Sequence, residues 1–259
     1  MITSTSNPKV RLLRSLAERK ARERLGRCLL EGVRLVEAAQ AAGLTLDPIL
    51  YAPERLAATA AGRALRKRLE HLAAAEEVAD GVFRTLADTV TSQGVVAAAP
   101  IPPAQPLRAE GLVLVLDAIA DPGNAGTIIR SAHAGGAAGV VALQGTADLW
   151  APRTMRAAMG SHFQVPLHVN LNWERLRPAL HPRRLLIATA HAGPAYWDVD
   201  LRGPTAIIIG SEAHGASSAA QAVASGSIRI PMAAGADSLN AAAAAAILLF
   251  EAARQWGAS

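Results

Sequence analysis

The sequence predicts an α/β protein with two domains, a small α/β domain followed by a larger domain with a parallel sheet. The second half of the chain alternates short, almost uninterrupted apolar runs with helical segments. Such runs are typical of parallel strands that helices cover on both faces. Four prolines between Pro100 and Pro106 separate the two halves, and this stretch favours an extended spacer. We therefore expect domains at residues 1–99 and 111–259, joined by a linker at residues 100–110.

The composition limits the class of protein. The chain has 259 residues, of which 51% are hydrophobic, so it can bury a large core. Its most apolar helical run, Ala241–Phe250, has only about half the residues that a membrane span requires. The first residues contain no apolar signal-peptide core, and Cys28 is the only cysteine, so we expect neither secretion nor a disulfide framework. The expectation is a cytoplasmic protein without a membrane partner.

In the front domain, apolar spacing between Asn7 and Ala39 predicts two helices. The further elements expected there are a strand at Ile49–Ala52, a helix at Arg63–Leu72, strand-like runs at Val78–Phe83 and Gly94–Ala99, and a short helix at Phe83–Ala87. None of these segments carries a pattern typical of catalysis.

The first 34 residues are strongly basic. Their nine basic side chains, against three acidic ones, are Lys9, Arg11, Arg14, Arg19, Lys20, Arg22, Arg24, Arg27 and Arg34. A merely solvated helix face is the alternative, but such faces more often mix the two signs of charge evenly. The segment therefore favours a surface that binds nucleic acid.

The strands expected in the larger domain are Leu112–Leu116, Gly139–Leu143, Val165–Val169, Leu185–Ala190, Thr205–Gly210 and Ile228–Ile230. In open parallel sheets, ligands bind at the carboxyl ends of strands. Polar, glycine-containing turns follow three of these strands, and each is a candidate site.

The first turn leads from Leu116 through Asp121-Pro122-Gly123-Asn124 into a helix that carries Arg130. Asn124 is placed to cap this helix, and Arg130 lies on the same face as Thr127. Each residue has a structural alternative, a plain helix cap for Asn124 and a surface salt bridge for Arg130. Together, after a buried strand, they indicate a polar site for an anionic substrate.

The second and third turns follow the last two strands. Gly210 to Gly215 holds one carboxylate, Glu212, between glycines, while His214 has no partner at ligand spacing and is expected to be a turn residue. The third turn runs through Pro231–Ala236 into an Asp-Ser-Leu-Asn cluster, which caps and opens a buried alanine-rich helix at Ala241–Arg254. No Gly-x-Gly-x-x-Gly follows a strand, so a dinucleotide fold is unsupported.

In order and spacing, these three turns resemble the motifs of the SpoU (TrmH) branch of the SPOUT RNA methyltransferases. The resemblance covers about residue 111 to the end. The front domain, with its Thr5–Val10 and Leu30–Val36 segments, resembles the ribosomal-protein-L30e-like RNA-binding module of members that act on ribosomal RNA. Two departures occur, Ala213 where a second glycine is common and Ala241-Ala242 where Val-Ser is common. The second departure removes one hydroxyl.

The resemblance implies an α/β fold with a C-terminal trefoil knot, a homodimer packed through the knotted region, and methyl transfer from S-adenosylmethionine to a ribose 2′-hydroxyl of RNA. By motif matching, the cofactor-binding residues are Thr189, Gly210, Ile230, Met232 and Leu239. The catalytic set is Asn124, Arg130, Glu212, Ser238 and Asn240. The family proposal gives the arginine a base-like role, but a guanidinium stays protonated in proteins. We therefore expect Arg130 to hold a phosphate and polarise the hydroxyl.

The main expectation is a methyltransferase for 23S ribosomal RNA. Alternatives are a transfer RNA ribose methyltransferase, a ribosomal RNA enzyme that confers antibiotic resistance, and a non-catalytic RNA-binding scaffold. The four polar residues Asn124, Arg130, Glu212 and Asn240 count against a scaffold. A metal hydrolase is disfavoured, because the seven histidines lack ligand spacing and no metal site is expected.

Overall fold

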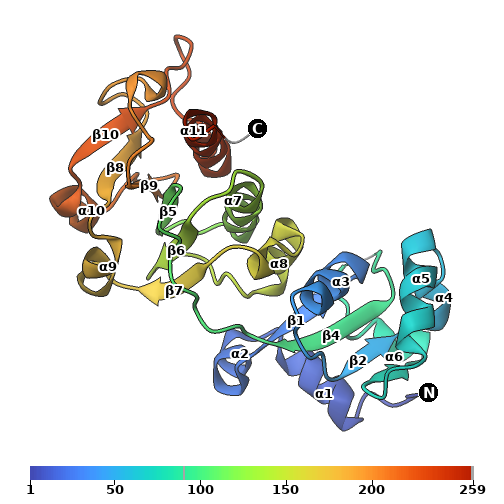
Figure 1. Ribbon diagram of the computed structural model, residues 1–259. Coiled ribbons are helices and arrows are strands. Elements are labelled where there is room, and N and C mark those ends of the chain that lie inside the picture. Colours follow the sequence, from blue (N-terminus) through green and yellow to red (C-terminus); the bar gives the residue numbers. More distant parts are fainter. Residues whose placement is uncertain (90, 258–259) are drawn as a thin grey trace. The chain divides into compact units, whose positions relative to one another are not determined.

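A computed structural model describes residues 1–89 and 91–257 of the chain (Figure 1). They form two compact units. The first contains Met1–Pro103 together with Trp150–Phe163, and the second contains Ala104–Leu149 and Gln164–Ser259. The chain therefore leaves the second unit after Leu149, contributes fourteen residues to the first unit, and returns at Gln164.

The first unit is built on a four-stranded sheet with the order β1-β4-β2-β3. Its strands are β1 (Arg27–Glu31), β2 (Ile49–Tyr51), β3 (Ala75–Glu77) and β4 (Val95–Pro100). Strand β4 pairs antiparallel with β1 and β2, whereas β2 and β3 are parallel. The helices of this unit are α1 (Pro8–Ser15), α2 (Arg19–Leu25), α3 (Val33–Ala41), α4 (Pro53–Leu56), α5 (Ala60–Leu69), α6 (Asp80–Phe83) and α8 (Pro152–Ala158), followed by a 3₁₀ turn, η1 (Ser161–Phe163).

Two predictions for this unit are wrong. Residues 27–31, expected within a helix, form β1, because Cys28, Leu29 and Leu30 are all buried and a short apolar run fits a strand as well as a helix. The run Val78–Phe83, expected to be a strand, ends in helix α6, which begins at Asp80 and buries Val82 and Phe83. This helix ends at Phe83, so it lies before the short helix expected at Phe83–Ala87, where the chain forms turns. Strand β4 also continues through Pro100, the first proline of the expected linker.

Helix α8 packs on β1 of this unit, and an ion pair with the buried carboxylate of Glu31 joins the two elements. Glu31, whose side chain is only 4% exposed, accepts hydrogen bonds from Thr89 Oγ1, the Asp88 amide and Arg156 Nη1 of α8, the last at 3.2 Å. The second arm of the Arg156 guanidinium donates to Asp88 Oδ2 at 2.7 Å. Since a buried carboxylate needs a compensating charge, this ion pair ties α8 to the first unit.

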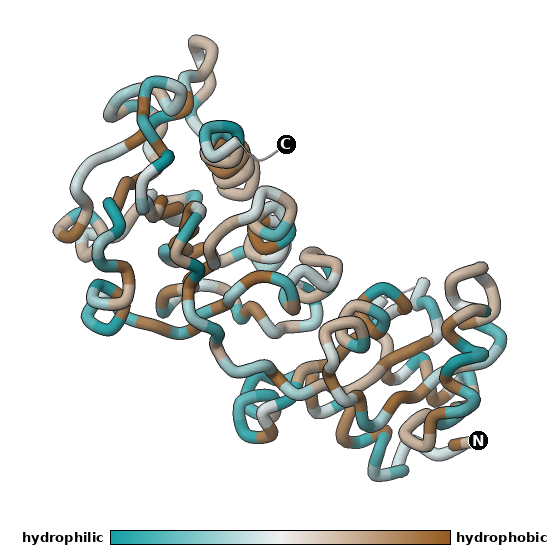
Figure 2. The backbone as a smooth tube through the Cα atoms, in the orientation of Figure 1, coloured by the Kyte–Doolittle hydropathy of each residue, from teal (hydrophilic) through white to brown (hydrophobic). Residues whose placement is uncertain are grey.

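The second unit confirms the expected parallel sheet. Its order is β10-β8-β9-β5-β6-β7, and all five neighbouring pairs are parallel. The strands are β5 (Val113–Asp117), β6 (Gly139–Leu143), β7 (Leu167–Leu171), β8 (Arg184–Thr189), β9 (Thr205–Gly210) and β10 (Gly226–Arg229). In Figure 2, apolar stretches run along strands of both sheets, as expected for buried strands. Every residue of β5 and β6 is buried.

The helices of the second unit are α7 (Pro122–Ala134), α9 (Trp173–Leu180), α10 (Ser218–Val223) and α11 (Ala241–Gln255), with a 3₁₀ turn, η2 (Tyr196–Asp198). Helix α11 packs along α7. It buries Ala241, Ala242, Ala245, Leu248, Leu249 and Ala252 but leaves Phe250 49% exposed, so it is buried on one face only. None of the helices described here combines the length and hydropathy that crossing a membrane requires.

Candidate active site

The candidate site lies at the carboxyl ends of strands β5, β9 and β10. Helix α7 follows β5, the turn Ser211–Gly215 follows β9, and the loop at residues 230–240 connects β10 to α11. Strands β5 and β9 are hydrogen-bonded neighbours, with Asp117 opposite Gly210. The sheet therefore brings the first two sequence motifs to one edge, as parallel pairing requires.

The helix after β5 is capped by Asp121 and not, as expected, by Asn124. The Asp121 carboxylate accepts a hydrogen bond from the Asn124 amide at 2.8 Å, the usual geometry of an N-cap. Asp121 directly precedes the first helical residue, Pro122, and its carboxylate reaches the amide three residues further on. The amide side chain of Asn124 is consequently available for other contacts.

A hydrogen-bonded chain joins all three motifs through Asn124. Its Nδ2 donates to Glu212 Oε1, and its Oδ1 accepts from Asn240 Nδ2 at 3.0 Å. Asn240 is itself held by α11, because its Oδ1 accepts from the amides of Ala242 at 2.9 Å and Ala243 at 3.3 Å. Helix α11 thus begins at Ala241, as predicted, with Asn240 as its cap. The cap fixes Asn240, which orients Asn124, which in turn orients the Glu212 carboxylate.

A cavity of about 460 Å³ opens beside this chain of contacts. All five residues expected to bind the cofactor line it, namely Thr189, Gly210, Ile230, Met232 and Leu239. Two of the expected catalytic residues, Glu212 and Ser238, line it as well. The remaining wall includes Ile187, Ile209 and His214, so the cavity is mostly apolar with a few polar groups.

Gly210 permits the close backbone approach that shapes this cavity. A Cβ at this position would lie 2.2 Å from the Ala216 amide nitrogen and 2.2 Å from the carbonyl carbon of Gly215. The turn is closed by two backbone hydrogen bonds between Ser211 and Gly215, at 3.0 and 2.8 Å. Only glycine fits where the strand end and the returning turn meet so closely.

Sequence reasoning missed Asp117. This buried residue ends β5, and its Oδ2 accepts a hydrogen bond from the Ser217 amide at 2.7 Å. It therefore fastens the end of the Ser211–Gly215 turn to the neighbouring strand. A carboxylate that ends an otherwise apolar run is the signal that could have identified it, since buried acids are rare without partners.

The structure does not bring Arg130 into this network. Arg130 lies on α7, six residues beyond Asn124, and is exposed, as is Thr127. Its side chain does not line the cavity and makes no hydrogen bond or ion pair with the residues that the structure describes. A guanidinium without a partner among the described residues is suited to an anionic ligand from solution. Across residues 1–89 and 91–257, no group of three or more His, Cys, Asp or Glu side chains could hold a metal ion.

The fold and the site define an α/β enzyme that binds its ligand at the carboxyl ends of parallel strands. The model of the SpoU rRNA Methylase family matches residues 111–250, and that of an MRM3-like substrate binding domain matches residues 7–97. The chain belongs to the SpoU rRNA Methylase family.

The relatives described next resemble the chain over at least 96% of its length. An uncharacterized tRNA/rRNA methyltransferase from Synechocystis is 34% identical, over 100% of this chain and 95% of the relative. The 23S rRNA (guanosine(2553)-2′-O)-methyltransferase RlmP of Bacillus subtilis is 31% identical, over 96% of this chain and 97% of the relative. The crystal structure of the SpoU methyltransferase AviRb from Streptomyces viridochromogenes with AdoMet matches with a TM-score of 0.84 and 31% identity, covering 97% and 99% of the two chains.

Proposed function

We propose that this chain transfers a methyl group from S-adenosylmethionine to a ribose 2′-hydroxyl of ribosomal RNA, with 23S ribosomal RNA as the substrate. One observation carries the proposal: three separate sequence motifs converge on a single cavity and a single hydrogen-bonded chain of side chains. Full-length relatives with this activity in their names support the choice of substrate.

The cavity fits the cofactor. Its volume of about 460 Å³ lies within the range of ligand pockets, roughly 300 to 1,000 Å³. Ile230, Met232 and Leu239 offer apolar contacts, and the backbone at Thr189 and Gly210 offers hydrogen-bonding groups at strand ends. These five residues are proposed to hold S-adenosylmethionine. When bound, its sulfonium supplies the methyl group that leaves by in-line displacement.

The polar residues of the site position the ribose. Asn240 and Asn124 hold the Glu212 carboxylate in one orientation, so little side-chain freedom remains to be lost when RNA binds. Alignment of this kind lowers the activation free energy of a reaction by several kcal/mol, and by about 7 kcal/mol or more in the best cases. We assign Asn124, Glu212, Ser238 and Asn240 to this positioning.

Arg130 has a different role. Its guanidinium is exposed, stays protonated, and has five N–H donors to offer an anion. We assign it to the phosphate next to the target ribose, where it also polarises the hydroxyl. Because it remains protonated, it does not take the proton itself.

The front domain, residues 1–99, is proposed to bind RNA, and the linker at residues 100–110 to join it to the methyltransferase domain at residues 111–259. The match of residues 7–97 to an MRM3-like substrate binding domain supports the RNA-binding role of the front domain. An L30e-like front fold, a trefoil knot around the cofactor site and a cytoplasmic location complete the proposal, by resemblance to the family.

A homodimer is also proposed. Helix α11 covers α7 with one face and leaves Phe250 49% exposed on another. An exposed aromatic side chain on a largely apolar helix is typical of an interface that a second copy covers.

A second candidate substrate is transfer RNA, because the Synechocystis relative is named as a tRNA/rRNA methyltransferase. The protein should therefore be incubated with radiolabelled S-adenosylmethionine and with separated transfer RNA, small-subunit and large-subunit ribosomal RNA. Label in the large-subunit RNA supports the proposal. Label in transfer RNA alone supports the alternative, and label in no RNA at all supports a non-catalytic scaffold.

The same assay tests the role of Arg130. Arg130→Ala should lower methyl transfer by roughly 100-fold, the upper range for a lost charge-assisted hydrogen bond. Its affinity for S-adenosylmethionine in a calorimetric titration should stay within about twofold of the wild type, since Arg130 does not line the cavity. Thr127→Ala, an exposed change one turn earlier on α7, is the matched control and should change neither quantity. An equal loss of transfer and cofactor affinity in Arg130→Ala contradicts the assignment.

A further inference from the structure

The basic residues of the first unit fall into two groups, those neutralised by neighbouring carboxylates and those that are not. On α5, Arg66 pairs with Glu70 at 3.0 Å and lies 3.9 Å from Glu77, and Arg68 pairs with Glu37. Elsewhere in the unit, Arg55 and Arg84 both pair with Asp80, and Lys9 pairs with Glu76. These cations are paired within the protein, so they attract a polyanion only weakly.

Helices α1 and α2 differ. Four side chains of these helices are exposed and form no ion pair or hydrogen bond with described residues, namely those of Arg11 and Arg14 on α1 and of Lys20 and Arg24 on α2. Arg11 and Arg14 are three residues apart, and Lys20 and Arg24 four apart, so each pair occupies one face of its helix. The acidic residues of this segment are few: Glu23 pairs with Arg19, and Glu18 precedes α2.

The two helices are fixed to each other by a buried arginine. Arg22 of α2 is only 3% exposed, and its Nη1 donates to the carbonyl oxygens of Leu16 at 2.8 Å and Ala17 at 2.7 Å, where α1 ends. The Arg22 guanidinium is buried and donates to these carbonyl oxygens, so it is not available to a ligand. Its effect is to hold the four free cations on a rigid pair of helices.

We propose that Arg11, Arg14, Lys20 and Arg24, named here the α1–α2 cation set, form the surface with which the first unit binds the phosphate backbone of RNA. The proposal rests on the proposed RNA substrate and narrows it to one face of one unit. Long cations without carboxylate partners suit phosphates, and contacts to phosphates position a nucleic acid without reading its sequence. The α1–α2 cation set therefore supplies affinity and orientation, and binding through it depends steeply on salt.

The test is a titration of deproteinised bacterial 23S ribosomal RNA in a filter-binding assay between 50 and 200 mM salt. The variant Arg11→Ala/Arg14→Ala/Lys20→Ala/Arg24→Ala removes the set. Its matched control, Arg63→Ala/Arg66→Ala/Lys67→Ala/Arg68→Ala, removes an equal number of charges from α5. Of these, Arg66 and Arg68 are ion-paired, Arg63 Nη1 donates to the Ala57 carbonyl oxygen at 2.8 Å, and Lys67 is not ion-paired with described residues. All eight side chains are at least partly exposed, so both variants are expected to fold, and thermal melts verify this.

Loss of the set should lower RNA affinity at least tenfold at about 100 mM salt and reduce the slope of log K against log salt by about 3, for four phosphate contacts. The α5 control should stay within about twofold of the wild type, with little change in slope. A third variant, Arg11→Lys/Arg14→Lys/Arg24→Lys, keeps the charges and should keep the affinity. Equal losses in the α1–α2 and α5 variants, or a larger loss in α5, overturn the proposal, as does an unchanged slope.

The methyl-transfer assay on the same preparations separates this surface from the proposed function. If the wild type methylates RNA and the α1–α2 variant does so with unchanged KM, the surface is wrong and the function stands. If the wild type methylates no RNA but binds it, and the α1–α2 variant binds RNA more weakly, the surface stands and the proposed function is wrong.

Discussion

At the scale of single residues, the two glycines of the site meet different physical requirements. Gly210 has no positive φ, but a Cβ there would overlap the backbone of Gly215 and Ala216 at 2.2 Å. Gly235, in the loop before α11, has a φ of +87°, yet a Cβ there would meet nothing within 4 Å. A side chain at Gly210 is excluded by lack of space, whereas at Gly235 it is disfavoured by backbone strain.

This difference predicts unequal effects on cofactor binding. Gly210→Ala should displace the Ser211–Gly215 turn and weaken the affinity for S-adenosylmethionine more than tenfold. Gly235→Val should cost about 1 kcal/mol of backbone strain, weaken the cofactor several-fold through Met232 and Leu239 of the same loop, and affect RNA binding less.

Calorimetry of cofactor binding and filter binding of RNA measure both changes. Gly203→Ala, a position with open space and no positive φ, is the control and should bind as the wild type does. A larger effect of Gly235→Val than of Gly210→Ala on the cofactor would contradict this account.

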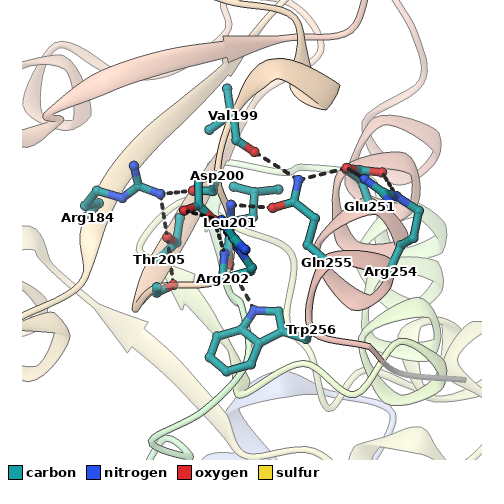
Figure 3. Close-up of polar contacts among 11 residues, drawn as sticks. Arg184, Val199, Asp200, Leu201, Arg202, Thr205, Glu251, Arg254, Gln255 and Trp256 are labelled. Atoms are coloured by element: carbon teal, nitrogen blue, oxygen red, sulfur yellow. Dashed lines mark hydrogen bonds and ion pairs between the residues drawn. The ribbon is translucent and has the colours of Figure 1, made fainter.

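At the scale of elements, α11 is held at both ends by polar contacts. Its first turn carries Asn240 of the site, and its last turn is fastened to the segment Val199–Leu201 (Figure 3). Gln255 Oε1 accepts from the Leu201 amide at 2.7 Å, Gln255 Nε2 donates to the Val199 carbonyl at 2.9 Å, and Trp256 Nε1 donates to the Leu201 carbonyl at 2.9 Å. These contacts fix the C-terminal end of α11 and so help to fix Asn240 at its N-terminal end.

Glu251 makes this anchor sensitive to acid. The Arg254 guanidinium and then the Gln255 amide, which donates to Glu251 Oε1 at 2.8 Å, hold the pKa of Glu251 below its usual value. A lowered pKa in the folded state contributes stability that is present above the unfolded pKa, about 4.3, and is lost as pH falls through the folded value.

Glu251→Gln should therefore lower the free energy of unfolding by up to about 1 kcal/mol at pH 7, and the difference should shrink as the pH falls below the unfolded pKa of about 4.3. Urea unfolding at a series of pH values measures it. Glu110→Gln removes an exposed carboxylate that is not ion-paired to the described part of the chain, and it should show no such trend. A difference that persists unchanged at pH 3 would refute the linkage to Glu251.

The sequence was most informative where a pattern had one structural solution. Several short apolar runs that alternate with helical segments indicate a parallel sheet covered by helices, so the sheet of the second unit was predictable to within a few residues per strand. The run Cys28–Leu30 had two outcomes, and only its pairing with β4 selects the strand. Asp121 and Asn124 both suit a helix cap, so the choice between them depended on the backbone path. The contacts among Asn124, Glu212 and Asn240 join residues far apart in the chain and could not be derived from local spacing.

At the scale of the whole molecule, the exposed face of α11 predicts the oligomeric state. Phe250→Glu places a charge on the proposed contact and should convert a dimer to a monomer at micromolar concentration, because a buried unpaired charge costs several kcal/mol. Light scattering after gel filtration measures the mass. Trp197→Glu changes another exposed aromatic residue, 54% exposed in η2, and should leave the mass unchanged. A wild-type mass of one chain would rule out the dimer.

The return of residues 150–163 to the first unit affects how the protein can be synthesised and recombined. Glu31 emerges early from a ribosome, but its partner Arg156 follows only after β5 and β6 have been made. The first unit therefore completes its packing late, after part of the second unit has left the ribosome. A gene fusion that transplants only residues 1–103 would leave Glu31 without Arg156 in its buried site. An exchange between relatives should therefore move residues 1–103 together with residues 150–163, which contain α8 and η1.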